Sequence, residues 1–233
     1  MKLLDLFCGA GGAGMGYHRA GFEVVGVDLL PQKNYPFEFI QMDAFEALER
    51  FGPYFDVIHA SPPCQGYSIM QNLGWHKDID YPLLIDPIRA ILLKLGRPYI
   101  IENVMGARLD ANYLCGGMFG LPFFRHRLFE TSFFWLSPGH PKHTFQQGMP
   151  GSPKPRAIFT GKRVYSNFTS LSLGRERDGK SRLHGYPDGW HLGKEAMGID
   201  WMNKKELTQA IPPAYTEYIG NAMHETLFKT VGK

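Results

Sequence analysis

The sequence predicts an α/β fold, a parallel sheet with helices wound on both of its faces. Four short apolar runs have the character of strands, at residues 2–7, 22–27, 55–60 and 98–101. Helical spacing follows the first run, up to residue 20, and returns over residues 82–95. Strands that alternate with helices favour parallel pairing, and ligands of such sheets bind at the carboxyl ends of the strands.

One compact domain with a small appendage suits the chain's 233 residues, of which 44% are hydrophobic. Its three cysteines, Cys8, Cys64 and Cys115, are widely spaced, so we expect neither a disulfide scaffold nor a metal site. Asp5 interrupts the N-terminal apolar run, which argues against a signal peptide, and the longest apolar stretches are far too short to span a membrane. We therefore expect a soluble protein in a reducing compartment, with no membrane partner.

The pattern of the chain changes after the sheet. Residues 113–134 are rich in strand formers, residues 137–194 are dominated by turns, charges and aromatics, and residues 197–231 regain helical character. Residues 151–183 carry eight Lys and Arg against two acidic residues, a net charge of +6, whereas the whole chain carries +3. This basic segment is typical of a surface that meets phosphates, although a solvated, flexible insertion would have the same composition.

A glycine-rich turn, Cys8-Gly9-Ala10-Gly11-Gly12, follows the first strand where the chain turns into a helix. Glycines at such a turn let a ligand approach the backbone closely. Asp28, at the tip of the next strand, is placed to accept hydrogen bonds from ribose hydroxyls. Because no Lys-Ser or Lys-Thr follows the glycines, the turn does not fit the phosphate-binding loop, and a nucleoside without phosphates is the better ligand.

Cys64 lies just beyond the third strand, in Ser61-Pro62-Pro63-Cys64. Two prolines with restricted φ hold the thiol rigidly, which favours nucleophilic attack, although a lone cysteine is more often structural. Glu102 closes the strand at 98–101, and a carboxylate at the same edge of the sheet can protonate or hydrogen-bond a substrate under attack. By itself, Glu102 would more often be an exposed strand-end carboxylate or a helix cap.

Arg125 and Arg127 flank His126 in a predicted strand. Side chains two apart on a strand point to the same face, so the two guanidinium groups are suited to hold an anion or a carbonyl. The alternative is an exposed basic edge strand.

Taken together, these segments resemble the cytosine-5 DNA methyltransferase family. The family's elements appear in its order: Asp5-Leu6-Phe7-Cys8-Gly9-Ala10-Gly11-Gly12, Pro63-Cys64-Gln65, Glu102-Asn103-Val104, Arg125-His126-Arg127 and Gly220-Asn221-Ala222. The resemblance implies a Rossmann-like class I methyltransferase sheet that binds S-adenosylmethionine, without a metal, and methylates C5 of a flipped-out cytosine. It divides the chain into a catalytic and cofactor-binding domain at 1–136, a small, loop-rich target-recognition region at 137–194, and a C-terminal segment at 195–233 that returns to the catalytic domain.

The resemblance also implies a role for each matching residue. Cys64 would be the nucleophile, Glu102 the partner of the cytosine N3 and amino group, and Arg127, with Arg125, would hold the base carbonyl. Cofactor contacts would come from Phe7, Gly9, Gly11, Asp28 at the ribose, Asp43 at the adenine amino group, and Asn221. DNA contacts would come from Gln65 and Ser68, in the stretch Gln65 to Trp75 that could close over the site. The charge of residues 151–183, and not the resemblance, adds Arg156, Lys162, Arg163, Arg175 and Arg177 as expected DNA contacts.

The chain departs from the family pattern at Phe123, where the family usually has a glutamine, and a phenylalanine ring cannot make the polar contact of that glutamine. The region after Arg127 is also short for target recognition, so the recognition site is brief or specificity is relaxed. We expect duplex DNA as the partner of a monomeric, cytoplasmic enzyme of a prokaryotic or phage-infected cell. Two alternatives remain open. One is an RNA cytosine methyltransferase, because the motifs do not predict contacts with the 2′-hydroxyl that distinguishes RNA from DNA. The other is a catalytically silent, cofactor-binding regulator of a partner enzyme.

Overall fold

A computed structural model describes residues 1–67, 81–121, 123–142 and 189–228, together with the backbone of four short strands between residues 158 and 183. Contacts within the chain divide it into two units. The sheet unit comprises Met1–Leu114, His126–Ser137 and Ile211–Lys233, and the second unit comprises Cys115–Arg125 and Pro138–Ala210.

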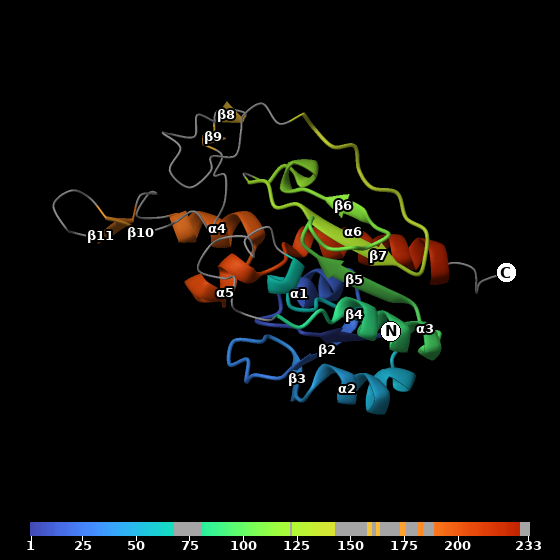
Figure 1. Ribbon diagram of the computed structural model, residues 1–233. Coiled ribbons are helices and arrows are strands. Elements are labelled where there is room, and N and C mark those ends of the chain that lie inside the picture. The colour runs from blue at the N-terminus through green and yellow to red at the C-terminus, as the bar shows by residue number, and fades with distance from the viewer. Residues whose placement is uncertain are drawn as a thin grey trace. The chain divides into compact units, whose positions relative to one another are not determined.

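The sheet unit is built on one seven-stranded sheet (Figure 1). Its strands lie in the order β3 (Glu38–Gln41), β2 (Glu23–Asp28), β1 (Lys2–Leu6), β4 (Val57–Ala60), β5 (Tyr99–Asn103), β7 (Arg127–Thr131) and β6 (Asn112–Leu114). The first five strands pair in parallel, and β7 pairs antiparallel with both β5 and β6. The four strands predicted from the sequence, β1, β2, β4 and β5, are thus confirmed as parallel neighbours.

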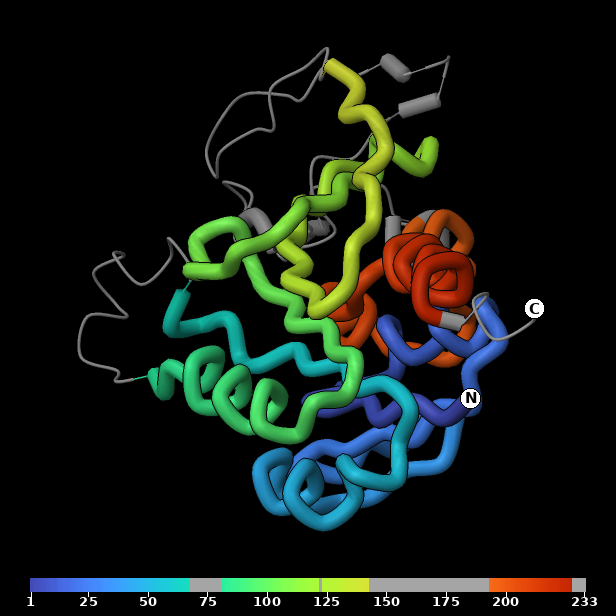
Figure 2. Tube along the Cα trace, turned by 90° about the vertical axis from the view of Figure 1, so that its right-hand side faces the viewer, coloured from blue at the N-terminus to red at the C-terminus, as the bar shows by residue number. Residues whose placement is uncertain are grey.

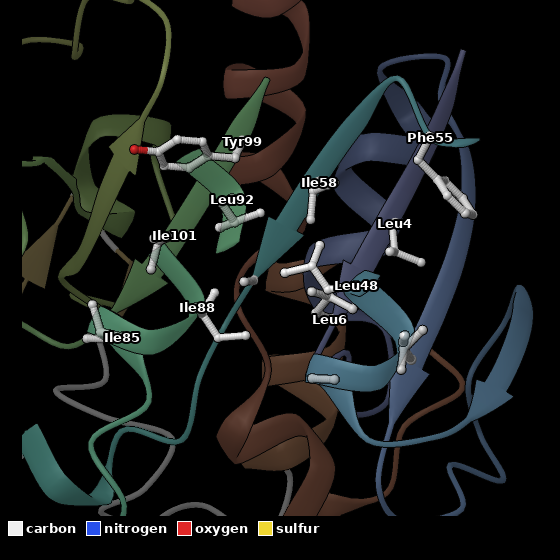
Figure 3. Packing of buried hydrophobic residues seen from close by; sticks show 14 of the residues in the cluster. Leu4, Leu6, Leu48, Phe55, Ile58, Ile85, Ile88, Leu92, Tyr99 and Ile101 are labelled. Atoms are coloured by element: carbon white, nitrogen blue, oxygen red, sulfur yellow. The ribbon is translucent and has the colours of Figure 1, made fainter. Parts of the chain in front are cut away.

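One face of the sheet carries the main hydrophobic core (Figure 3). Leu4 and Leu6 of β1 and Ile58 of β4 pack there with α2 (Ala44–Phe51) and α3 (Ile85–Leu95). The two leucines are two apart, as expected where strand side chains alternate between faces. All three side chains are fully buried, and burial of an aliphatic side chain of this size contributes about 1.5–3 kcal/mol to folding.

The opposite face is covered by α1 (Gly12–Arg19) and α6 (Pro213–Met223), which lie side by side (Figure 2). The helices approach closely because α1 has a glycine at their contact. A Cβ on Gly16 would lie 2.0 Å from Oγ1 of Thr216, which donates a hydrogen bond to the Ala13 carbonyl at 2.8 Å. The C-terminal helix therefore packs directly on the helix that follows the glycine turn.

The second unit contains the short helices η4 (Gly116–Phe119), α4 (Gly189–Met197) and α5 (Lys204–Gln209). Asn203 caps α5 by accepting a hydrogen bond from the Glu206 backbone N at 3.1 Å. The short strands pair antiparallel two by two: β8 (Ile158–Phe159) with β9 (Lys162–Arg163), and β10 (Leu173–Arg175) with β11 (Ser181–Leu183). No helix in the described part of the chain combines the length and apolarity needed to cross a membrane.

Candidate active site

The carboxyl ends of β1, β2, β4 and β5 meet at one edge of the sheet, because these neighbouring strands run in parallel. The glycine turn follows β1, and Asp28 ends β2. The turn that carries Cys64 follows β4, and Glu102 lies one residue before the end of β5. This edge brings together the segments that the sequence places there, all within the sheet unit.

Asp28 ties the glycine turn to the end of β2. Its Oδ2 accepts a hydrogen bond from the Gly9 backbone N at 3.0 Å, and its Oδ1 accepts one from the Leu30 backbone N at 3.1 Å. Gly9 and Gly11 have φ angles of +49° and +84°, where a side chain would strain the backbone. A Cβ on Gly9 would meet no atom of the described residues within 4 Å, so the backbone there is open to a ligand.

A buried aspartate–tyrosine pair supports the glycine turn from inside the fold. Asp5 of β1 is fully buried, and Tyr35 Oη donates to its Oδ2 at 3.3 Å. The Tyr35 ring packs so closely on β2 that a Cβ on Gly26 would lie 2.3 Å from it. Burial raises the pKa of Asp5 to about 7. The sequence analysis missed Tyr35, because the loop between β2 and β3 has no periodicity that would place it.

The turn that carries Cys64 is anchored to both neighbouring strands. The Ser61 backbone N donates to the Leu6 carbonyl at 3.2 Å, and Asn103 Nδ2 donates to the Pro62 carbonyl at 2.9 Å. Together with the two prolines, these hydrogen bonds fix the backbone that leads to the thiol.

Cys64 differs from the other two cysteines in its exposure. It is partly exposed, whereas Cys8 and Cys115 are buried. Burial raises the pKa of both buried thiols, and the Asp5 carboxylate raises that of Cys8 further. Because the thiolate is the nucleophilic form, Cys64 is the cysteine best placed to react.

A buried ion pair joins β5 to β7. Arg127 Nε lies 3.0 Å from Glu102 Oε1, and Glu102 is only 5% exposed. Glu102 lies opposite Phe129 in the antiparallel register, and Arg127, two residues from Phe129, shares that face. A carboxylate buried in this way requires a charged partner, which Arg127 supplies.

Comparison with known proteins identifies the family. The sequence model of the C-5 cytosine-specific DNA methylase family matches residues 1–115. Over 127 residues, 47% of the chain, the sequence is 31% identical to the Type II methyltransferase M.HgiGI of Herpetosiphon aurantiacus, of which it covers 95%. The chain belongs to the C-5 cytosine-specific DNA methylase family. It is also 34% identical over 113 residues, 46% of the chain, to the Type II methyltransferase M.FnuDI of Fusobacterium nucleatum, but spans only 33% of that relative's length.

The fold is shared with solved structures of low sequence identity. A protein assigned as a DNA modification methyltransferase encoded within an E. coli prophage matches with a TM-score of 0.58 at 17% identity, over 97% of this chain and 99% of that one. The S. pombe Dnmt2 methyltransferase matches with a TM-score of 0.52 at 14% identity, over 97% and 98% of the two chains. At these identities the likeness shows the fold alone, and it confirms the predicted class I methyltransferase sheet.

The prediction that Arg125 and Arg127 share one face of a strand is wrong. Strand β7 begins at Arg127, where its pairing with Leu114 of β6 starts. Arg125 precedes the strand and is buried in the second unit, where its Nη2 donates to the Thr208 carbonyl. In this member of the DNA methylase family, the Arg-x-Arg element is therefore divided between a strand and the segment before it.

Three more residues that the resemblance singles out lie at the ends of elements or on their surface. Asp43 is the N-cap of α2, and its Oδ1 accepts a hydrogen bond from the Phe45 backbone N at 2.9 Å. Asn221 is exposed on α6, and Gln65 is exposed directly after Cys64. Their contacts with a cofactor or with DNA stay predictions.

The other predicted DNA contacts lie where side chains are not described. Ser68, Arg156 and Arg177 lie outside the described residues. Lys162, Arg163 and Arg175 lie on short strands of which only the backbone is described. Of the stretch predicted to close over the site, Gln65 to Trp75, the structure describes only Gln65–Tyr67. Phe123, which replaces the DNA methylase family's glutamine, is 1% exposed, so an apolar ring fills the place of the amide.

The raised pKa of Asp5 predicts a pH-dependent stability. Between its ordinary pKa of 3.8 and its folded pKa of about 7, this carboxyl binds more protons in the folded state than in the unfolded state. Its contribution to the free energy of unfolding therefore falls as the pH rises through this range. Because asparagine does not ionise, we expect the free energy of unfolding of Asp5→Asn to lack this fall, which amounts to up to about 4 kcal/mol in the parent.

Urea denaturation of the parent and of Asp5→Asn at several pH values between about 4 and 8 measures this difference. Burial lowers the pKa of His59 to about 3, so His59 makes the free energy of unfolding rise with pH. This contribution is the same in both proteins and cancels in their difference. A constant difference between the two proteins across the range would contradict the prediction.

Proposed function

We propose that this protein transfers a methyl group from S-adenosylmethionine to C5 of cytosine in DNA, through a covalent bond between Cys64 and C6. The observation that carries the proposal is the placement of a partly exposed thiol and a buried Glu102–Arg127 ion pair at the ends of two adjacent parallel strands. Membership of the C-5 cytosine-specific DNA methylase family supports the same reaction.

Cys64, Glu102 and Arg127 each have a separate role in the proposed reaction. C5 of cytosine is too electron-poor to attack a methyl sulfonium directly, whereas addition of a thiolate at C6 makes C5 enamine-like. In the proposed mechanism the Cys64 thiolate adds to C6 while Glu102 stabilises the proton at N3. Once C5 carries the methyl group, its proton is lost to solvent, the C6–S bond breaks and the thiolate returns. Arg127 holds the Glu102 carboxylate in place and lies beside the position of the base carbonyl.

The glycine turn fits a nucleoside cofactor. S-adenosylmethionine supplies an electrophilic methyl group when it is bound. The open backbone at Gly9 allows close approach, and each Asp28 oxygen keeps a lone pair for a ribose hydroxyl beyond the backbone hydrogen bond that it accepts. Phe7, Gly11, Asp43 and Asn221 are the other residues that we propose to contact the cofactor.

A transfer assay with tritium-labelled S-adenosylmethionine tests the function. We expect label in duplex DNA, recovered as 5-methylcytosine after digestion. A duplex hides C6, so the target base must leave the stack at a cost of a few kcal/mol. Label in tRNA but not in DNA would favour an RNA methyltransferase instead. Binding of S-adenosylhomocysteine without label in duplex DNA, single-stranded DNA or tRNA would favour a silent regulator.

We further propose that the basic segment at residues 151–183 supplies most phosphate contacts and any reading of base edges. Its net charge of +6 suits a duplex, and the catalytic motifs that the family shares do not encode a target sequence. Arginines at 156, 163, 175 and 177 suit guanine contacts, because a guanidinium group can form two hydrogen bonds to guanine.

Asp28→Ala should weaken cofactor binding more than it slows the reaction. The variant loses both the ribose acceptor and the hydrogen bond that holds Gly9, so we expect affinity for S-adenosylhomocysteine to fall by about 10- to 100-fold. Calorimetry measures the affinity, with Asp56→Ala as the control, because Asp56 is an exposed aspartate at the opposite end of the strands. Equal affinities of the two variants for S-adenosylhomocysteine would show that Asp28 does not contact the cofactor.

A further inference from the structure

A chain of polar groups reaches from inside the sheet unit to the turn that carries Cys64. It consists of Tyr17 of α1, His59 of β4, and Ser61, the first residue after β4. Tyr17 Oη lies 2.9 Å from His59 Nδ1, and His59 Nε2 lies 2.8 Å from Ser61 Oγ. Tyr17 and His59 are fully buried, and the proposed mechanism uses none of the three side chains.

Burial sets the direction of these hydrogen bonds. It lowers the pKa of His59 to about 3, so the imidazole is neutral and only one ring nitrogen carries a proton. Burial also raises the pKa of Tyr17 well above its ordinary value, so its hydroxyl stays protonated and needs an acceptor. Among the described residues that acceptor is His59 Nδ1, which leaves the imidazole proton on Nε2, donating to Ser61 Oγ. The Ser61 hydroxyl then keeps its own proton to donate onward at the edge of the sheet.

Burying these polar side chains lowers the stability of the fold unless each of them has its hydrogen-bond partner. The strand neighbours of His59, Ile58 and Ala60, are fully buried apolar residues, and an apolar side chain at position 59 would avoid the desolvation of an imidazole. A tyrosine or a histidine alone at this depth would leave a polar group without a partner. The hydrogen bonds therefore hold the ring in one orientation and with it the Ser61 side chain.

We infer that Tyr17, His59 and Ser61 form a positioning relay that fixes the turn from Ser61 to Cys64 and so sets the place of the reacting thiol. Ser61 is where strand becomes turn, and its backbone N is already bound to the Leu6 carbonyl at 3.2 Å. The relay adds a side-chain anchor at the same residue. The catalytic part of this inference rests on the proposed role of Cys64, whereas the anchoring of the turn does not.

Kinetics of variants test the catalytic part. Ser61→Ala removes the last member of the relay at a partly exposed site, and we expect kcat to fall about 10- to 100-fold, the scale for a slightly misplaced reacting group. Affinity for S-adenosylhomocysteine should stay unchanged, and Ser61→Thr, which keeps the hydroxyl, should recover most of the rate. A fall in cofactor affinity as large as the fall in kcat would overturn the relay, because Ser61 would then be a cofactor contact.

Hydrogen exchange tests the anchoring of the turn without any assay of methylation. Tyr17→Phe and Ser61→Ala should both speed amide exchange in the peptide that contains residues 61–67. The control is Tyr215→Phe, which removes a hydroxyl from an equally buried tyrosine that packs against Phe129, and it should leave this peptide unchanged. Parent-like exchange in both relay variants would overturn the inference even if the parent methylates DNA. Faster exchange would uphold the anchor even if the parent does not.

Discussion

Replacing Cys64 with serine should reduce methyl transfer by at least about 1,000-fold, the scale for loss of a catalytic nucleophile. A serine hydroxyl is far less acidic than a thiol, and its alkoxide is not populated near neutral pH, so addition at C6 stops. Affinity for S-adenosylhomocysteine should remain close to that of the parent, because the cofactor turn follows a different strand from the Cys64 turn. Tritium transfer and calorimetry measure the two quantities.

An oligonucleotide that contains 5-fluorocytosine identifies the reacting cysteine directly. Fluorine at C5 does not leave as a proton does, so the bond between the enzyme and C6 persists. We expect mass spectrometry to find the adduct on Cys64, the partly exposed thiol, in the parent and in the control Cys115→Ala. An adduct on Cys8 or Cys115 would contradict the assignment.

The central strands were predictable because a parallel sheet buries both faces and leaves unbroken apolar runs in the sequence. The predicted helix at 82–95 begins instead at Ile85. A start at residue 82 would place Pro87 where an interior N–H is needed, whereas a start at Ile85 places it in the first turn, where no such bond is lost. Helix α2 had a readable signal, because Asp43 followed three residues later by Glu46 is typical of a helix N-terminus.

The contacts within the site were less predictable than its location. The ends of parallel strands bring Asp28, Cys64 and Glu102 to one edge whatever their side chains do. The pairing of Glu102 with Arg127 depends instead on the register between β5 and β7, two strands separated by 23 residues, Val104 to His126, that carry no signal for register. The hydrogen bond between Tyr17 and His59 depends in the same way on how α1 lies across the sheet.

Replacing Glu102 with glutamine should slow methylation by about 100-fold or more, the usual contribution of a positioned acid. An amide has nearly the same shape as the carboxylate but no negative charge to stabilise a proton at the cytosine N3. The change also leaves the Arg127 guanidinium without the carboxylate 3.0 Å from its Nε. Cofactor affinity should barely change, and single-turnover rates with saturating cofactor measure the chemical step.

The matched control is Glu130→Gln. Glu130 is also a buried carboxylate paired with an arginine: Arg89 donates to its two oxygens at 2.7 and 2.8 Å. It lies on β7, three residues from Arg127, opposite Ile101 in the register, so its side chain is on the other face of the sheet from Glu102. Loss of its charge should lower the melting temperature without slowing the single-turnover rate of the folded enzyme. If both variants lose stability and rate to the same extent, Glu102 is a structural residue whose ion pair only joins β5 to β7, and the acid must be sought elsewhere.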